Sequence, residues 1–263
     1  MVPLRAAITD LIEGARQWRI WGMLAIADVR QRYRRSRLGQ FWLTISMGIT
    51  IVALGFVYST IFQIPLDKYL PLIADSLIVW GLISAICNEG ATTFIEAEIY
   101  IRSAPLPKSV YVYRMLFRNL IIFLHNLIIA PVVMLIFGAM PNWNLLFLLP
   151  AVLLTLLTGI WAALILGTLS ARFRDLPPIV AALTQIAFFL SPIMWSASQL
   201  RGQFSFLTEW NPFAAFLNIM RDPLLGMPPN SQAWGVASFI TVVGCIAGTL
   251  FYARFRSRIS YYL

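Results

Sequence analysis

The chain has 263 residues, of which 59% are hydrophobic and 12% are charged, and its net charge is +9. Soluble domains carry roughly 25% charged residues, so too few charges remain here to cover a water-facing surface. The composition excludes an ordinary soluble protein and predicts an integral membrane protein, in which the basic excess belongs to the flanks of apolar segments and not to a nucleic-acid surface.

Residues 1–40 predict an amphipathic helix that lies in the inner membrane interface. Apolar side chains recur there at spacings of three and four, and two of them are the tryptophans Trp18 and Trp21. Tryptophan on such a face is typical of a helix that lies on the membrane and does not cross it. The charged residues at the other positions are Arg5, Asp10, Glu13, Arg16 and Arg19.

Residues 41–253 predict an all-α permease domain with six membrane-spanning helices, because about 20 apolar residues are needed to cross the hydrocarbon core. The predicted spans are 41–62, 70–91, 119–138, 145–169, 179–197 and 233–253. With both termini in the cytoplasm, only Lys68, Arg201 and Arg221 among the lysines and arginines fall on the outer side, as the positive-inside rule favours. Residues 254–263 are then a cytoplasmic tail.

Two connections between the predicted spans have unusual sequences. Residues 96–108 are polar and contain Pro105 and Pro107, which fits either a docking surface or an ordinary solvated loop. Residues 198–232 contain an apolar helical face that is too short to span the membrane, bounded by Asn211–Pro212 and Asp222–Pro223. We expect short re-entrant helices there, dipping into the membrane from outside between spans five and six.

Motifs for catalysis are missing from the sequence. It has no phosphate-binding loop of the form G-x-x-x-x-G-K-[ST], no H-E-x-x-H pair and no cluster of cysteine and histidine. We therefore expect no catalytic residue, no metal site and no cofactor on this chain, and energy supplied by another protein. Glu89 and either Arg114 or Arg118 are expected to approach each other across the hairpin between spans two and three, as a structural ion pair.

Four sequence blocks resemble the membrane subunits of ATP-binding-cassette polysaccharide exporters. They are DVRQRYRRSRLGQFW (28–42), RFRDLP (172–177), IAFFLSPIMW (186–195) and WNPFAAFLNIMR (210–221). The blocks occur in the family's order and extend over nearly the whole chain. The chain departs from the family pattern at Ala27, where arginine is usual.

The resemblance implies a homodimeric permease in the bacterial inner membrane that works with two copies of a cytoplasmic ATPase, which binds ATP and Mg²⁺. It implies export of a lipid-linked polysaccharide of the O-antigen or capsule type. It also assigns roles to four groups of residues. Residues of the basic segment are expected to receive the lipid pyrophosphate, because guanidinium binds phosphate oxygens in a bidentate fork; they are Arg30, Arg32, Tyr33, Arg34, Arg35, Arg37, Leu38 and Gly39.

The other three groups are expected in the channel, at the ATPase and at the outer gate. Channel-lining candidates in spans one and five are Trp42, Tyr58, Phe62, Phe188, Phe189 and Trp195. Residues expected to couple the permease to the ATPase are Glu96, Glu98, Arg102, Pro105, Pro107 and Lys108. Outer-gate candidates are Trp210, Asn211, Pro212, Phe213, Phe216 and Arg221.

Three alternatives remain beside this interpretation. The same architecture exports other cargoes, such as teichoic acid, drugs or haem. An integral-membrane lipid-modifying enzyme would need acids or histidines that converge at one depth, whereas Asp75, Glu89, His125 and Asp175 are scattered. An ion-coupled secondary transporter would be expected to show internal repeats or interrupted helices, and no convincing repeat occurs.

Overall fold

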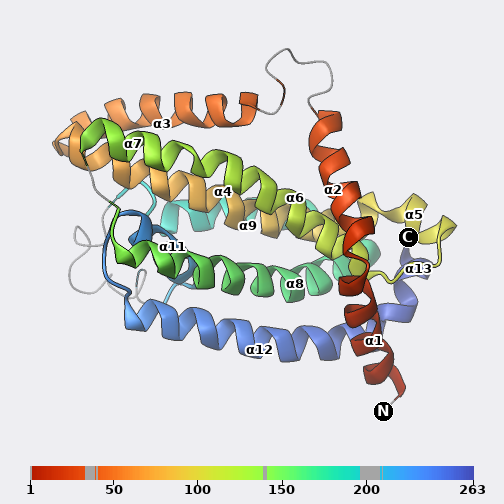
Figure 1. The fold of residues 1–263 in the computed structure, drawn as a ribbon. Coiled ribbons are helices and arrows are strands. Elements are labelled where there is room, and N and C mark those ends of the chain that lie inside the picture. The colour runs from red at the N-terminus through yellow and green to blue at the C-terminus, as the bar shows by residue number, and fades with distance from the viewer. Residues whose placement is uncertain (1, 33–38, 40, 139–140, 196–207, 209) are drawn as a thin grey trace.

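The computed structural model describes residues 2–32, 39, 41–138, 141–195, 208 and 210–263. Every regular element in this part of the chain is helical, which confirms the predicted all-α class (Figure 1). Five helical stretches are long and apolar enough to cross a membrane. They run over Phe41–Phe62, Leu66–Ser103, Ser109–Phe137, Trp143–Arg172 and Ser231–Tyr262.

The long helices form one bundle. They are α3 (Phe41–Phe62), α4 (Leu66–Glu96), α6 (Ser109–Leu127) continued by α7 (Ile129–Phe137), α8 (Leu148–Arg172) and α12 (Ser231–Phe255). The shorter helices are α1 (Val2–Arg16), α2 (Trp18–Arg32), α5 (Glu98–Ser103), η1 (Trp143–Phe147), α9 (Leu176–Leu190), α11 (Pro212–Leu224), η3 (Arg256–Arg258) and α13 (Ile259–Tyr262).

Figure 1 shows the bundle helices running roughly parallel, with both ends of the chain at the same end of the bundle, here called the terminal end. The helices α1 and α2 lie across the bundle at the terminal end, nearly perpendicular to α8 and α12 (Figure 1). The predicted N-terminal helix is therefore two helices, divided at Gln17. α11 lies at the opposite end.

Helix α4 is the centre of the bundle. About two thirds of its most apolar window is buried, against 11% for α3, and it packs against α3, α6, α8, α9 and α11. α8 approaches α4 closely because small residues line the contact: a Cβ on Gly90 would lie 3.4 Å from the Cα of Ala163. Small residues at such positions let membrane helices pack closely.

Helix α12 packs against α8 through a G-x-x-x-G pair, Gly244 and Gly248. A Cβ on Gly248 would lie 2.6 Å from the Cβ of Trp161 in α8, and a Cβ on Gly244 would collide with the Trp161 ring. Such a pair is the usual signature of close packing between membrane helices. This close contact was not predicted from the sequence.

Helix α9 has only 15 residues. At 1.5 Å per residue it is about 22 Å long, shorter than the hydrocarbon core of about 30 Å, whereas the sequence predicted a span over 179–197. Described residues 191–195 after it form bends and turns, and 196–197 lie outside the described part. In Figure 1, α8 ends at the terminal end and α12 begins at the opposite end, so the chain between them connects the two ends.

The tail predicted at 254–263 is helical and packed against the bundle. After α12 the chain continues through η3 and α13, and α13 packs against α8 and α5. The side chains of Ile259 and Leu263 are buried there.

Candidate functional site

Two polar networks at the terminal end each attach one N-terminal helix to the bundle. The first is centred on Asp10 of α1, whose side chain is fully buried. Its carboxylate accepts hydrogen bonds from the backbone N–H groups of Lys108 at 3.1 Å and Ser109 at 3.0 Å, from the Tyr252 hydroxyl at 3.0 Å and from Arg256 Nε at 2.8 Å. The first N–H groups of a helix have no partner within it. Asp10 therefore caps α6 from a distant element and joins it to α12.

The close contact between α1 and α6 requires a small residue at position 14. A side chain on Gly14 would collide with the Ser109 hydroxyl, which donates a hydrogen bond to the carbonyl oxygen of Asp10 at 2.7 Å. Ala7, Asp10 and Gly14 thus form the buried stripe of α1. The apolar residues Leu4 and Ile8 are exposed on another face.

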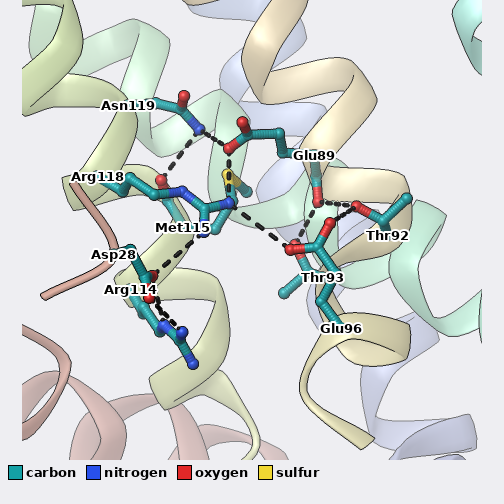
Figure 2. Close-up of polar contacts among 9 residues, drawn as sticks. All are labelled: Asp28, Glu89, Thr92, Thr93, Glu96, Arg114, Met115, Arg118 and Asn119. Carbon is teal, nitrogen blue, oxygen red and sulfur yellow. Dashed lines mark hydrogen bonds and ion pairs between the residues drawn. The ribbon is translucent and has the colours of Figure 1, made fainter. Parts of the chain in front are cut away.

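The second network begins at Asp28 in α2 (Figure 2). Its two carboxylate oxygens accept hydrogen bonds from Arg114 Nε and Nη2 at 2.7 and 2.6 Å, and one of them also accepts from Arg118 Nη1 at 3.2 Å. These side chains are between 12% and 17% exposed. Charge-assisted bidentate pairs of this kind are among the stronger polar contacts in proteins.

Arg118 extends the second network to α4. Its Nη2 donates to Glu89 Oε2 at 2.8 Å and lies 3.8 Å from Glu96 Oε2, while Asn119 Nδ2 donates to the same Glu89 oxygen at 2.7 Å. Figure 2 shows these side chains converging between α4 and α6. The predicted approach of Glu89 to an arginine of the hairpin is thus confirmed for Arg118. The link from Arg118 to Asp28 was not predicted.

The second network consists of ion pairs and hydrogen bonds that join three helices, and its role is structural. Asp28, Glu89 and Glu96 each accept hydrogen bonds from guanidinium, amide or hydroxyl groups. Among the described residues, no group of three or more histidine, cysteine, aspartate or glutamate side chains is placed to hold a metal ion. The network fixes α2, α4 and α6 relative to one another.

The predicted basic segment is described only in part. Arg30 is exposed near the end of α2, which ends at Arg32, and Gly39 has φ +56°, a backbone conformation that favours glycine. Asp28 therefore fixes the helix just before this segment begins. Tyr33, Arg34, Arg35, Arg37 and Leu38 lie outside the described residues.

The predicted coupling residues lie between the end of α4 and the start of α6. Glu98 in α5 pairs with Arg102 at 2.9 Å and lies 3.8 Å from Arg174 in the turn between α8 and α9. The Lys108 ammonium donates to the Arg256 carbonyl at 2.7 Å. Burial lowers the pKa of Lys108, the Arg256 charge lowers it further, and the Asp10 carboxylate opposes both effects. Glu96 ends α4, and Pro105 and Pro107 lie in the non-helical connection to α6.

The predicted channel aromatics divide between α3 and the region of α9. The rings of Tyr58 and Phe62 pack against each other with their centroids 5.7 Å apart. Trp42, at the start of α3, is 48% exposed. The ring of Phe188 packs against the ring of Trp80 in α4, with centroids 5.7 Å apart, whereas the Phe189 side chain is 63% exposed.

Trp195 lies beyond α9, where its indole N–H donates to the Phe189 carbonyl at 3.4 Å. An open apolar groove of about 500 Å³ lies between α9 and the start of α11, and its lining includes Leu183, Ile186, Leu190 and Trp210.

The predicted outer-gate residues fold around the start and end of α11. Asn211 caps the helix by accepting from the N–H groups of Phe213 and Ala214, and Pro212 occupies its first turn. Asn211 also donates to the Leu190 carbonyl at 3.3 Å, which joins α11 to α9. Trp210 is 72% exposed, whereas Phe216 is buried.

The buried side chain of Arg221 is hydrogen-bonded to the turn after α9. Its Nη1 donates to the Pro192 carbonyl at 2.7 Å and its Nη2 donates to Asn218 Oδ1 at 2.7 Å. Several of the predicted gate residues are thus hydrogen-bonded to the end of α9 and the turn after it. The ring of Phe213 also packs against Trp80 of α4, with centroids 5.9 Å apart.

Comparison with known proteins gives consistent matches over most of the chain. The family described as "ABC-2 type transporter" matches residues 20–225. Two relatives from Klebsiella pneumoniae, each named "O-antigen export system permease protein RfbA", are 19% identical over 232 residues, covering 88% of this chain and 90% of theirs. A relative of the same name from Myxococcus xanthus is 21% identical over 192 residues, covering 72% and 74%.

Proposed function

The chain belongs to the ABC-2 type transporter family, and on that premise we propose that it is the permease subunit of an exporter for a lipid-linked polysaccharide of the O-antigen or capsule type. It is a multi-pass integral membrane protein of a transporter. The observation that carries the proposal is the match over 88% of the chain to permeases named for O-antigen export. In a bacterium its place is the inner membrane.

The proposed topology has six crossings with both termini in the cytoplasm. Five long helices alone would leave the two ends of the chain on opposite sides, yet Figure 1 places both at the terminal end. The proposed sixth crossing belongs to the connection from α8 to α12 and includes α9. The proposed cytoplasmic side is the terminal end, which holds the basic residues of α1, α2 and η3. The region around α11 then dips in from outside.

The proposed assembly is a homodimer with two copies of a separate ATPase, which bind ATP and Mg²⁺. Support comes from the sequence, which has no phosphate-binding loop, and from α5, which presents exposed side chains at the terminal end. ATPase movement at α5 would reach Glu96, and through Arg118 it would reach Asp28 and α2. Only a contact that differs between two states can transmit such coupling.

The proposed path of the substrate begins at the basic segment and ends at α11. The arginines after Asp28 receive the lipid pyrophosphate, α3 and α9 line the channel with their exposed faces, and the assembly of Asn211 and Arg221 closes the outer side. The many exposed apolar residues of α3 and α9 support this, because they are not used in packing within one subunit. Teichoic acid, drug or haem export by the same architecture is the second candidate, and a lipid-modifying enzyme is the third.

Deletion and complementation test the function. A strain that lacks this chain should accumulate lipid-linked polysaccharide on the cytoplasmic face and lose it from the cell surface, and the wild-type chain together with its cognate ATPase should restore it. The cognate ATPase is to be sought as a phosphate-loop protein encoded beside this chain. Normal surface polysaccharide in the deletion strain, or nucleotide hydrolysis by the purified chain alone, would contradict the proposal.

A further inference from the structure

Three exposed apolar side chains from separate segments lie at the terminal end and are here called the inner apolar surface. They are Ile99 in α5, Phe173 after α8 and Tyr261 in α13, which are 77%, 50% and 88% exposed. α13 packs against both α5 and α8. The surface therefore joins the predicted coupling segment to residues far from it in the sequence.

The segments that carry this surface are fixed to one another. The Arg172 guanidinium lies over the ring of Phe173 at 5.0 Å and over the ring of Tyr262 at 5.6 Å, and Arg174 lies 3.8 Å from Glu98 of α5. The next ring, Tyr261, lies 6.3 Å from that of Tyr262.

The short helix that carries Tyr261 is itself anchored in the bundle. The residues on either side, Ile259 and Leu263, are buried, with exposures of 0% and 9%. An aromatic side chain on a fixed support loses little conformational entropy when a partner covers it. Tyr261 is thus presented outward by a helix whose other face is packed.

The position of the surface argues against lipid as its cover. In Figure 1, α5 extends farther along the bundle axis at the terminal end than α1 and α2 do, and α13 packs against it. α1 and α2 lie across the bundle, as helices in a membrane interface do, and aromatic residues that anchor a protein in that interface lie at the same depth. α5, with α13 packed against it, is therefore placed toward the water side of the interface.

The charges around the surface indicate the chemistry of its partner. The exposed basic residues in and next to these segments outnumber the exposed acidic ones: Arg102, Arg172, Arg174, Arg254 and Arg258 stand against Glu96 and Asp175, while Glu98 is partly buried. A complementary protein surface would carry an apolar pocket with acidic side chains at its rim. Aromatic anchors that fill pockets are the usual centres of binding energy in protein interfaces.

We propose that Tyr261 is a second docking residue for the cytoplasmic ATPase, which would bind α5 and α13 together as one surface. This rests on the proposed function, which assigns the ATPase to α5 and the residues on either side of it. It adds that movement of the ATPase reaches α12 directly, because α13 follows α12 in the chain.

A binding experiment with the full permease and its cognate ATPase tests the proposal. The permease is reconstituted in nanodiscs and titrated with purified ATPase, and the dissociation constant is measured for wild type, Tyr261→Ala, Tyr261→Phe, Ile99→Ala and Trp143→Ala. Trp143 is the matched control, because it is an aromatic residue with 85% exposure in η1, away from the terminal end. We expect Tyr261→Ala to weaken binding about tenfold or more, Tyr261→Phe to keep most of the affinity, and Trp143→Ala to match wild type.

The outcomes separate this inference from the proposed function. If Ile99→Ala weakens binding and Tyr261→Ala behaves like Trp143→Ala, α13 is no docking site, while the docking at α5 stands. If Tyr261→Ala lowers the thermal stability of the permease in lipid but leaves ATPase affinity unchanged, the residue contacts the membrane and the inference is wrong. If wild-type permease binds no ATPase, the proposed function fails together with the inference.

Discussion

Asp28 and Arg114 form a two-point ion pair between α2 and α6, with N–O distances of 2.6 and 2.7 Å, although 86 residues separate them in the sequence. Asp28 lies in the first block that resembles polysaccharide exporters, directly before the basic segment. A residue of this block therefore has a structural partner in the bundle. Movement of α2 must either break this contact or move α6 as well.

A double-mutant cycle measures the strength of this pair. Asp28→Asn, Arg114→Gln and the double variant should give unfolding free energies that are non-additive by about 1–3 kcal/mol, because a partly shielded, bidentate pair is lost. The matched control is the pair Glu98 and Arg102, which is 2.9 Å apart but 33% and 58% exposed; its coupling should stay near 0.3–0.5 kcal/mol. Equal coupling energies for the two pairs would show that shielding at Asp28 has no effect.

Removal of Asp10 should destabilise the protein more than removal of any other acid in α1. Asp10→Ala leaves two backbone N–H groups and Arg256 without their acceptor, a loss of about 2–5 kcal/mol. Asp10→Asn keeps one acceptor oxygen and should lose less. Glu13→Ala is the control, because Glu13 is exposed on the same helix, and it should stay within about 0.5 kcal/mol of wild type. Thermal unfolding in detergent gives the ranking, and similar losses for Asp10→Ala and Glu13→Ala would refute it.

Larger residues at Gly248 should force α12 away from α8. Gly248→Ala places a Cβ against the Cβ and backbone of Trp161, where little can move, and overpacking of this kind costs about 1–3 kcal/mol. Gly235→Ala in the same helix is the control, since nothing lies within 4 Å of its added Cβ. The midpoint of thermal unfolding should fall for the first variant and not for the second; a fall for both would point to a general effect of glycine replacement in α12.

Loss of charge in the basic segment should reduce export without loss of the assembled transporter. The variant with Arg32→Gln and Arg34→Gln removes two guanidinium groups that are proposed to bind the lipid pyrophosphate. Surface polysaccharide should fall several-fold, while the amount of co-purified ATPase stays constant. Arg16→Gln with Arg19→Gln removes the same charge from exposed positions of α1 and α2 and should leave export near wild type. Equal export in both double variants would leave these arginines as membrane anchors.

Stability should depend on pH through Lys108. Its folded-state pKa lies below the ordinary value of 10.5 because of burial, so the folded protein releases this proton more readily than the unfolded chain. The contribution of the group to the unfolding free energy is therefore greatest above 10.5 and is lost as pH falls through the folded pKa. Compared with Lys108→Met, wild type should gain stability as the pH rises toward 10.5, measured by thermal unfolding. A constant difference at all pH values would contradict this.

The sequence predicted the parts of the fold that depend on composition and short spacing. Apolar runs located α3, α8 and α12 well, because a helix that crosses lipid must be apolar over its length. The pair of Glu89 and Arg118 was predictable, because a hairpin brings the ends of consecutive spans together. α4 is longer than its apolar run and continues to Glu96, and its acidic residues Glu89 and Glu96 approach Arg118 of α6.

The remaining contacts depend on partners that are distant in the sequence. The sequence pattern placed Asp10 with the exposed charges of an amphipathic helix, and no local pattern showed that Lys108 and Arg256 would surround it. One signal was present: Ala7, Asp10 and Gly14 follow a helical spacing, and two of them are small. The division at Gln17 and the packed course of residues 254–263 were likewise not predictable from local sequence; α1 and α2 contact α6, and α13 contacts α8 and α5, all distant in the chain.

The central position of α4 also has a consequence for synthesis of the protein. Of the long helices only α3 precedes it, so α4 enters the membrane before α6, α8, α9 and α11 exist. Until they arrive, its buried polar side chains Asp75, Ser76 and Thr93 face lipid or the insertion machinery, where unpaired polar groups are costly. We expect the newly made chain to be most vulnerable to degradation in the interval between the insertion of α4 and the arrival of α8.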